Sequence, residues 1–346
     1  MSQSWPSLLG SLVRRTHLDA ESARWAMGEI LTGNASSVQI AAFAVALRTK
    51  GETVEEITGL AAAMLDNATQ VGLPREALDI VGSGGDRANT VNVSTMAAIV
   101  AAAAGLPVVK HGNRAASSKC GTADVLETLG VALDVPVPAQ PRVLEEAGIT
   151  FLFAPMYHPA LRHAAGARRE LGIQTTFNFL GPLVNPARPN ANAVGVADAS
   201  MAPLLAGVLA GRGARGLVFH GGDGLDELTT TATSTVWLIR DGQVWQDRID
   251  PSRLGLRLAQ PDDLAGGDSA HNAQVVWDLL GGRGGPIRDI VTLNAAAGLV
   301  AYDGPEPGRR LEDQLSEAMT RAESAIDSGA GAETLSRWIE VSQSRR

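Results

Sequence analysis

Short apolar runs alternate with longer runs of helical spacing from Ala77 onward, and this alternation restricts the possible fold more than any other feature of the sequence. Each of the runs ALDIVG, LPVVKHG and GITFLFAP precedes a loop and then a stretch with the spacing of a helix. Strands that alternate with helices form right-handed βαβ units, in which the strands lie parallel. The sequence therefore predicts an α/β fold with a largely parallel central sheet flanked by helices. The run STVWLIRDGQVWQD differs, because two alternating segments meet at Asp241-Gly242 and predict an antiparallel hairpin.

The region up to about Leu73 lacks this alternation and is predicted to form helices only. Helix caps are predicted here at Asp19, at Ser37, and at the capping box of Thr53 with Glu56. Three or four short helices are too few to bury a large core alone. We therefore expect their apolar faces to pack on the rest of the chain or on a second copy of it.

A chain of 346 residues is long for one hydrophobic core, which favours two domains. We predict a small all-helical domain over residues 1–75, joined by a helix from about residues 160–185. The large α/β domain is predicted over residues 76–346. A homodimer formed through the helical domain is the expected assembly.

The composition excludes several classes of function. The formal net charge of −8 argues against a nucleic-acid-binding protein, which usually carries a basic face. The single cysteine, Cys120, excludes an internal disulfide and a cysteine-based zinc cluster. The N-terminus has no signal-peptide layout, and the longest apolar run, residues 96–109, is too short to span a bilayer. We therefore expect a cytoplasmic protein that binds neither membranes nor nucleic acid.

A glycine-rich loop follows the first predicted strand, with the sequence GSGGD from Gly82 to Asp86. Glycines at this position let the backbone approach a ligand closely, and their N–H groups can face an anion. Two familiar nucleotide motifs do not fit: a dinucleotide fingerprint needs glycine where Arg87 stands, and no Gly-Lys-Ser/Thr run of a P-loop occurs. By itself, the loop is equally compatible with a simple tight turn.

Two polar stretches near this loop favour a phosphate site. The run NTVNVST, from Asn89 to Thr95, leads into a helix whose N-terminus can offer free N–H groups to a phosphate, although Ser94 or Thr95 is also expected to cap it. The run KHGNRAASSKCGTAD, from Lys110 to Asp124, also lies between a strand and a helix and has the composition of an anion clamp. Since ligands of open α/β sheets gather at the carboxyl ends of the strands, we expect both stretches to face one ligand.

Other candidate residues have charges that suit the same ligand. Asp226 and Glu227 form an acidic pair in a loop after the strand GLVFH, and carboxylates that share a site with phosphates suit magnesium. His158 follows a strand, and Arg168 lies on the next predicted helix. A cation facing the cleft would suit a substrate carboxylate, and only one of Arg168 and Arg169 can face it, because adjacent helical residues point about a third of a turn apart.

Taken together, these residues resemble the anthranilate phosphoribosyltransferase family. The family motif G-T-G-G-D appears as GSGGD, N-[IVL]-S-T as NVST, and K-H-G-N-R-x-x-S-S-x-x-G-S-A-D-x-L-E-x-L-G as KHGNRAASSKCGTADVLETLG. The runs HPALRHAAGARRELGIQTTFNFLGPLVNP and HGGDGLDELTTTATSTVW extend the resemblance over nearly the whole chain. It implies the nucleoside phosphorylase and phosphoribosyltransferase-like fold. Pyrimidine nucleoside phosphorylases share that fold, but their second loop differs.

The resemblance implies a role for each matching residue. Phosphoribosyl pyrophosphate would be held by Gly82, Gly85, Asp86, Thr90, Asn92, Val93, Ser94, Thr95, Lys110, His111, Gly112, Asn113, Arg114, Ala115, Ala116, Ser117, Ser118 and Thr122. Magnesium, expected as two ions per subunit, would be held by Ser94, Asp226 and Glu227. Anthranilate would be placed by Gly82, Asn113, His158 and Arg168, with Arg168 facing the carboxylate. The catalytic residues would be Lys110, Asn113 and His111.

Four positions depart from the family pattern. Ser83 and Thr122 exchange one hydroxyl residue for another, and Cys120 stands where serine is frequent. An exposed thiol at Cys120 would make the loop oxidisable. Gln174 replaces an arginine, which removes a positive charge from the region of the acceptor site.

The implied reaction transfers the phosphoribosyl group of 5-phosphoribosyl 1-pyrophosphate to the amine of anthranilate and releases pyrophosphate, the second step of tryptophan biosynthesis. We expect positioning and electrostatic stabilisation to dominate, with no covalent enzyme intermediate, and His111 is a candidate general base. Two alternatives stay open: a pyrimidine nucleoside phosphorylase on the same fold, and a non-catalytic paralogue that binds nucleotide.

Overall fold

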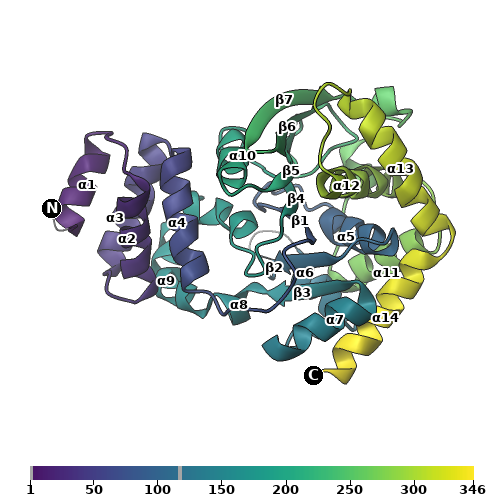
Figure 1. Ribbon diagram of the computed structural model, residues 1–346, viewed down its shortest axis with the longest axis horizontal. Coiled ribbons are helices and arrows are strands. Elements are labelled where there is room, and N and C mark those ends of the chain that lie inside the picture. The colour runs from purple at the N-terminus through teal and green to yellow at the C-terminus, as the bar shows by residue number, and fades with distance from the viewer. Residues whose placement is uncertain (1–2, 116–118) are drawn as a thin grey trace.

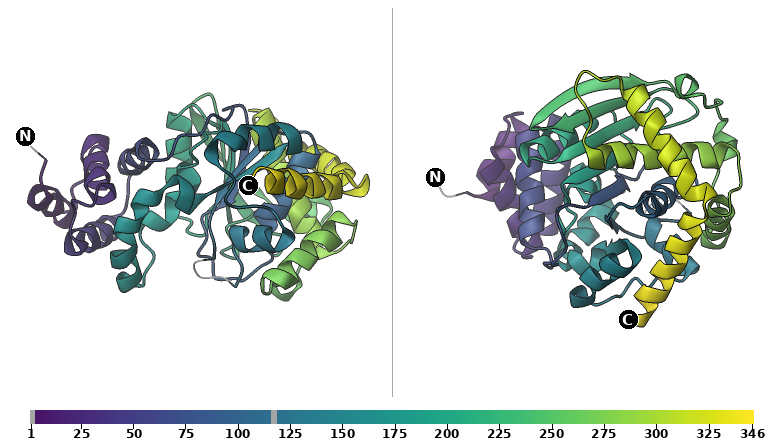
Figure 2. Two further views of the ribbon diagram at one scale, coloured as in Figure 1. Left: turned by 90° about the horizontal axis from the view of Figure 1, so that it is seen from below. Right: turned by 45° about the vertical axis from the view of Figure 1, so that its right-hand side comes forward.

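A computed structural model describes residues 3–115 and 119–346, which form a helical lobe and an α/β lobe (Figure 1). The helical lobe contains α1 (Trp5–Val13), α2 (Ala20–Leu31), α3 (Ser37–Lys50), α4 (Val54–Asp66) and, from later in the chain, α9 (Arg162–Leu171). Figure 2 shows this lobe at one end of the molecule, while the C-terminal helices lie on the α/β lobe. The predicted fold class, a helical N-terminal part with a mostly parallel α/β sheet, is confirmed.

The α/β lobe is organised around a sheet that has seven strands in the described chain, in the order β3-β2-β1-β4-β5-β6-β7. Strands β1 to β5 are parallel, and β6 and β7 are antiparallel. Their bounds are β1 (Leu78–Gly82), β2 (Val108–Gly112), β3 (Ile149–Phe153), β4 (Ala191–Gly195), β5 (Arg215–Gly221), β6 (Ser234–Arg240) and β7 (Gln243–Ile249). The predicted hairpin is present: Asp241 and Gly242 have φ of 51° and 75°, as a tight turn between twisted strands requires.

Helices cover both faces of the sheet. One face packs its apolar residues, such as Ile80 and Val108, against a layer of helices. This layer consists of α5 (Val93–Ala103), α6 (Thr122–Leu129), α11 (Ser269–Leu280), α12 (Pro286–Asp303), α13 (Leu311–Asp327) and α14 (Ala330–Ser344). The other face, which includes Val194 and Val218, packs against α10 (Ala202–Gly211) and joins the core of the helical lobe. The hydrophobic core of the helical lobe is therefore continuous with the core on this face of the sheet.

Shorter elements connect these layers. They are α7 (Gln140–Ala147), α8 (Ala154–Tyr157) and the 3-10 helices η1 (Val137–Ala139), η2 (Pro159–Leu161), η3 (Thr176–Phe179), η4 (Gly181–Leu183), η5 (Pro251–Leu254) and η6 (Pro261–Leu264). Within the described chain, no helix is long and apolar enough to cross a lipid bilayer.

The helix caps follow the sequence with one correction. The Asp19 side chain accepts a hydrogen bond from the Ser22 N–H at the start of α2, and Thr53 forms the predicted capping box with Glu56. The cap of α3 is Ser36 rather than Ser37, because the Ser36 side chain accepts from the Gln39 N–H and Gln39 bonds back in return.

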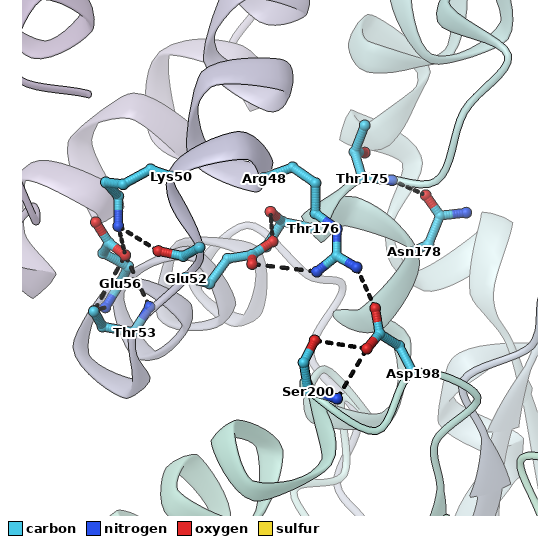
Figure 3. Close-up of polar contacts among 11 residues, drawn as sticks. Arg48, Lys50, Glu52, Thr53, Glu56, Thr175, Thr176, Asn178, Asp198 and Ser200 are labelled. Atoms are coloured by element: carbon cyan, nitrogen blue, oxygen red, sulfur yellow. Dashed lines mark hydrogen bonds and ion pairs between the residues drawn. The ribbon is translucent and has the colours of Figure 1, made fainter. Parts of the chain in front are cut away.

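An ionic network joins the helical lobe to the α/β lobe (Figure 3). Arg48 on α3 pairs with Glu52 at 3.3 Å and with Asp198, which follows β4. Glu52 in turn accepts a hydrogen bond of 2.5 Å from the Thr176 hydroxyl. Asp198 is held by the Ser200 N–H and hydroxyl at 2.9 and 2.6 Å. The carboxylates of Glu52 and Asp198 are therefore each held by other hydrogen bonds in addition to their ion pairs with Arg48.

Candidate active site

The predicted site residues gather at the carboxyl ends of the parallel strands. The strand order reverses between β1 and β4, so the loops after these strands diverge to opposite sides and leave a crevice between them. The loop from Gly82 follows β1, the loop from Asn113 follows β2, and Asp226 lies in the loop after β5. Open α/β sheets bind ligands at this position.

The glycine loop after β1 lies directly against Asp226. The Gly84 N–H donates a hydrogen bond of 2.6 Å to the Asp226 carboxylate. A β-carbon at Gly82 would overlap that carboxylate, and one at Gly195 would overlap the Asp226 backbone carbonyl. The close approach of the Asp226 side chain to Gly82 and of its backbone to Gly195 therefore accounts for glycine at both positions.

Helix α5 presents an open N-terminus beside this loop. Its N-cap residue is Asn92, and neither Ser94 nor Thr95 caps it, so the predicted side-chain cap is wrong: the described residues contain no side-chain cap bond at this helix. The Asn92 amide instead donates to the Cys120 carbonyl at 3.1 Å and accepts from Asn272 at 2.8 Å. The N-terminus of α5 therefore has no side-chain cap, although the Val93 and Thr95 N–H groups bond to the carbonyls of Val91 and Asn92. The helix dipole favours an anion at this end.

Lys110 is the cation closest to the acidic residues of the site. It lies on β2, is 1% exposed, and donates hydrogen bonds to the Ile80 carbonyl and to the Ser94 hydroxyl, the latter at 3.3 Å. Burial lowers its pKa, while the carboxylates of Asp79, Glu227 and Asp226 raise it. The ammonium group is thus fixed between β1 and the start of α5.

The positive charge near Asp226 and Glu227 does not balance the negative charge of these two carboxylates. Asp226 and Glu227 are each 8% exposed. Burial, and then the Asp86 carboxylate, raise the pKa of Asp226 to about 7. Burial and Asp226 raise the pKa of Glu227 well above its ordinary value, against the opposing effects of Lys110 and the Ser94 backbone. A divalent cation would relieve this repulsion.

The donor set fits magnesium that is completed by a substrate. Within residues 3–115 and 119–346, no group of three or more His, Cys, Asp or Glu side chains is arranged to hold a metal ion. Magnesium usually binds one or two carboxylates and takes its remaining ligands from water and substrate phosphates. Asp226, Glu227 and the Ser94 hydroxyl supply oxygen atoms of that kind.

Two buried histidines lie edge to face: His111 is near the end of β2, and His158 directly follows α8. The rings of His111 and His158 are 5.3 Å apart. Burial is the main cause that lowers the pKa of His111 to about 3, and it also lowers the pKa of His158. His158 Nε2 lies 2.8 Å from the Val184 carbonyl, whereas His111 Nε2 has no hydrogen-bond partner among the described residues. A histidine with so low a pKa is neutral at neutral pH but a weak base, so its role as a general base stays a prediction.

Arg168 on α9 is a partly buried cation without an anionic partner. It forms no ion pair or hydrogen bond in the part of the chain that the structure describes, and its guanidinium lies 5.7 Å from the centre of the Phe177 ring. Burial lowers its pKa. The neighbouring Arg169 is exposed, so the two arginines point in different directions, as predicted from the helix. In the described structure, no hydrogen bond or ion pair joins the Arg168 side chain to the other predicted site residues.

Gln174 connects the segment after α9 to the glycine loop. Its side-chain amide donates a hydrogen bond of 3.0 Å to the Gly85 carbonyl, and a β-carbon at Gly85 would overlap that amide. Gln174, one of the four positions that depart from the family pattern, therefore holds the glycine loop in place. The sequence alone did not indicate this contact.

Asp124 holds both ends of the loop between β2 and α6. This carboxylate accepts hydrogen bonds of 2.9 Å from the N–H groups of Ala115 and Gly121. The Arg114 guanidinium is already paired with Asp124 and Glu127, at 3.0 and 2.9 Å, so its contact with a pyrophosphate stays a prediction. Thr122 begins α6, and the Thr95 hydroxyl donates to its hydroxyl at 3.4 Å. The predicted residues Ala116, Ser117 and Ser118 lie outside the described residues.

The Cys120 thiol is not exposed, so it does not make the loop oxidisable. Its side chain is buried, and burial is the main cause that raises the pKa of the thiol to about 11. A thiol with so high a pKa is a poor nucleophile at neutral pH.

Asp79 and Asn185 are connected by hydrogen bonds to the site residue His111, but neither was predicted from the sequence. Asp79 is fully buried on β1 and accepts hydrogen bonds from the His111 N–H at 3.4 Å and from the Asn185 amide at 2.9 Å. Burial raises the pKa of Asp79 to about 6, against the opposing charge of Lys110. An acidic residue inside the apolar run ALDIVG was the available signal, because a buried carboxylate usually has partners. Asn185 carried no such signal.

Comparison with known proteins places the whole chain in one group. Residues 74–332 match the family model described as glycosyl transferase family, a/b domain, and residues 6–68 match its helical bundle domain. An anthranilate phosphoribosyltransferase of Arthrobacter sp. (strain FB24) is 58% identical over 340 residues, with 98% of this chain and 96% of that protein covered.

Solved structures give the same grouping. The anthranilate phosphoribosyltransferase of Thermus thermophilus has a TM-score of 0.89 and 39% identity, with 97% of this chain and 99% of that chain covered. The enzyme of Saccharomyces cerevisiae, solved in complex with PRPP and Mg, has a TM-score of 0.88 and 30% identity, with 98% of each chain covered.

Proposed function

The chain belongs to the anthranilate phosphoribosyltransferase family, and from this membership and the geometry of the site we propose how it transfers the phosphoribosyl group of 5-phosphoribosyl 1-pyrophosphate to the amine of anthranilate. The products are N-(5-phosphoribosyl)anthranilate and pyrophosphate, and the reaction is the second step of tryptophan biosynthesis. The observation that carries the assignment of the site is the meeting of a glycine loop, an open helix N-terminus and an acidic pair at one edge of the sheet.

Phosphoribosyl pyrophosphate would lie along the glycine loop and the N-terminus of α5. The Ser83 and Gly84 N–H groups already bond to the Gly195 carbonyl and the Asp226 carboxylate, so the N–H groups from Gly85 onward would face the phosphate oxygens. The positive end of the α5 dipole suits the same anion. Lys110 holds a positive charge beside them. The remaining contacts of the proposed set come from Gly85, Asp86, Thr90, Asn92, Val93, Thr95, His111, Gly112, Asn113, Arg114, Ala115, Ala116, Ser117, Ser118 and Thr122.

Magnesium would be held by Ser94, Asp226 and Glu227, and we propose two ions per subunit. When bound, the metal neutralises negative charge on the departing pyrophosphate. Lys110 is held by hydrogen bonds to the Ile80 carbonyl and the Ser94 hydroxyl, so we propose that it stabilises this charge with little reorganisation during the reaction.

Anthranilate would bind between Arg168, His158, Asn113 and Gly82. Arg168 carries a charge that no described residue balances, which suits the substrate carboxylate. Neutral His111 offers an unpartnered nitrogen, which suits a hydrogen bond from the amine. We propose that these groups position the amine for direct displacement, with Lys110 and Asn113 as the other catalytic residues.

Replacing Arg168 by glutamine is expected to raise the KM for anthranilate by roughly 10–100-fold with little change in kcat, because a hydrogen bond to a charged group is worth about 1.5–3 kcal/mol. Steady-state kinetics at saturating phosphoribosyl pyrophosphate measure both constants. The matched control is Arg169→Gln, since Arg169 is the exposed neighbour on the same helix. Equal effects of the two substitutions would contradict the role of Arg168.

The function is tested by mixing the protein with magnesium, phosphoribosyl pyrophosphate and anthranilate. Anthranilate fluorescence should fall, one pyrophosphate should appear for each anthranilate lost, and omission of any component should abolish both signals. Phosphate-dependent cleavage of uridine or thymidine in place of this reaction would identify a pyrimidine nucleoside phosphorylase. Activity in neither assay would identify a non-catalytic paralogue.

We propose that the chain forms a homodimer through its helical domain. Val38 and Val45 lie seven residues apart on α3, which places them on one face, and they are 78% and 37% exposed. Val13 and Ile173, also in the helical lobe, are 76% and 56% exposed. Exposed apolar residues that share a surface favour contact with another protein surface.

Light scattering after gel filtration is expected to give a dimer for the unmodified chain and a monomer for Val38→Asp/Val45→Asp, since two buried carboxylates without partners would oppose association. Leu258→Asp/Val244→Asp places the same charges on exposed apolar positions of the α/β lobe and should leave the dimer intact. A double Val38/Val45 variant that remains dimeric would contradict this interface.

Two further parts of the proposal concern organisation. We propose the domain limits 1–75 and 76–346, with the segment from about residues 160–185 assigned to the helical domain; the packing of α9 residues Ala164 and Ala167 in the helical core supports this. We also propose a cytoplasmic location, because phosphoribosyl pyrophosphate is a polyanion that does not cross a lipid bilayer unaided.

A further inference from the structure

A cavity of about 360 Å³ lies between the two lobes, on the far side of the sheet's strands from the candidate active site. Its walls include Leu65 on α4, Leu209 on α10, and Asn192 near the start of β4. Arg75, which precedes β1, also lines it. These are the amino-terminal ends of the parallel strands, whereas the candidate active site occupies the carboxyl ends. The cavity is therefore a separate site.

Three arginines line this cavity, and none of them forms an ion pair within the described chain: Arg75, Arg188 and Arg212. The one carboxylate in its wall, among the described residues, is Asp66, which is paired with Arg24 at 2.5 Å. The wall thus carries positive charge that the protein leaves uncompensated, which favours an anion.

Arg212 is the best placed of the three to bind. Its Nη1 donates a hydrogen bond of 2.6 Å to the Leu183 carbonyl, which fixes the guanidinium, while its Nη2 is buried and has no hydrogen-bond partner among the described residues. Burial and the nearby charge of Arg188 lower the pKa of Arg212 to about 10. Arg188 itself has a left-handed backbone, with φ of 51°, which a non-glycine residue adopts at a cost.

The rest of the cavity wall is largely apolar. Its apolar members are Ala62, Leu65, Pro182, Leu183, Pro189, Leu209 and Ala214. A fully hydrated ion such as inorganic phosphate would gain little from these side chains, whereas a ligand with an apolar body would bury surface against them.

We propose that this cavity binds a small organic carboxylate with an apolar body, whose carboxylate is held by Arg212 and Arg188. The ligand would touch α4 of the helical lobe and α10 of the α/β lobe together, so its binding would depend on how the lobes are arranged. Asn185 links the two sites, because it lines the cavity and donates to Asp79, which in turn accepts from the His111 N–H. This inference does not depend on the proposed reaction.

Benzoate is a suitable probe, and calorimetric titration at constant ionic strength measures its binding. The titration is made in Arg168→Gln protein, so that the proposed anthranilate site does not contribute. One binding event is expected, weakened at least about tenfold by the added Arg212→Gln substitution, because a lost charged hydrogen bond is worth about 1.5–3 kcal/mol. The matched control is Arg337→Gln, which removes an exposed arginine on α14 and should leave binding unchanged.

A second variant keeps the test decisive if Arg212→Gln fails to fold. Ala62→Phe inserts a ring into the cavity wall and should block benzoate while it leaves all three arginines in place. Absence of benzoate binding in the Arg168→Gln protein, or binding that survives both cavity variants, would overturn the proposal. Binding of inorganic phosphate as tightly as benzoate would overturn the assigned ligand class.

Discussion

The double variant Asp226→Asn/Glu227→Gln is expected to lose roughly 10²–10³-fold in kcat/KM, because removal of electrostatic stabilisation at a reacting group typically costs about 2.7–4 kcal/mol. Both substitutions keep the side-chain shape and remove the charge. They therefore eliminate the negative charge that would hold magnesium beside the Gly84 N–H and Lys110. Steady-state kinetics over a range of magnesium concentrations provide the measurement.

The control for this variant removes an adjacent acidic pair elsewhere. Glu145 and Glu146 are exposed neighbours on α7, so Glu145→Gln/Glu146→Gln makes the same change in net charge far from the site and should keep full activity. If the Asp226/Glu227 variant retained full turnover at saturating substrates, the assignment of these residues to the metal would be wrong.

Glu56→Ala is expected to destabilise the helical lobe by about 3–5 kcal/mol, the usual cost of breaking a buried ion pair by removing one partner. Glu56 is fully buried and pairs with Lys50 at 2.9 Å, and the Lys50 side chain is 1% exposed. Glu56 also accepts a hydrogen bond of 2.8 Å from the Leu18 N–H. Figure 3 shows a further bond, which it accepts from the Thr53 N–H at 2.9 Å. The variant leaves the Leu18 and Thr53 N–H groups without this acceptor, and the buried Lys50 ammonium keeps the Gly51 carbonyl but loses its carboxylate.

Hydrogen exchange measures this loss locally, because the two lobes need not unfold together. Amides of α2 and α4 should exchange at least about 100-fold faster in Glu56→Ala, since each 1.4 kcal/mol corresponds to about a tenfold change. Glu55→Ala removes the exposed neighbouring carboxylate and should leave exchange nearly unchanged. Similar exchange in both variants would show that the buried pair contributes little.

The architecture could be predicted from the sequence because local patterns determine it. The alternation after Ala77 predicted the parallel sheet, and Asp241-Gly242 predicted the hairpin. The capping box of Thr53 marked the start of α4. The cap of α3 was misplaced by one residue, because both Ser36 and Ser37 are suitable caps and only the reciprocal bond with Gln39 distinguishes them.

The supports of the site could not be predicted in the same way, because they depend on contacts between residues far apart in the chain. Gln174 reaches Gly85 across 89 positions, and Asn185 reaches Asp79 across 106. No local pattern fixes such pairs. Asn92 shows the same limit, because its side chain bonds to Cys120 and Asn272, which lie 28 and 180 positions away.

The most direct test of the account is a crystal structure with manganese, phosphoribosyl pyrophosphate and a non-reactive anthranilate analogue. Manganese replaces magnesium and can be located by anomalous scattering. We expect an anomalous peak beside Asp226 and Glu227, diphosphate density against the glycine loop and the N-terminus of α5, and the analogue's carboxylate at Arg168. Manganese bound elsewhere, or diphosphate density away from the glycine loop, would contradict it.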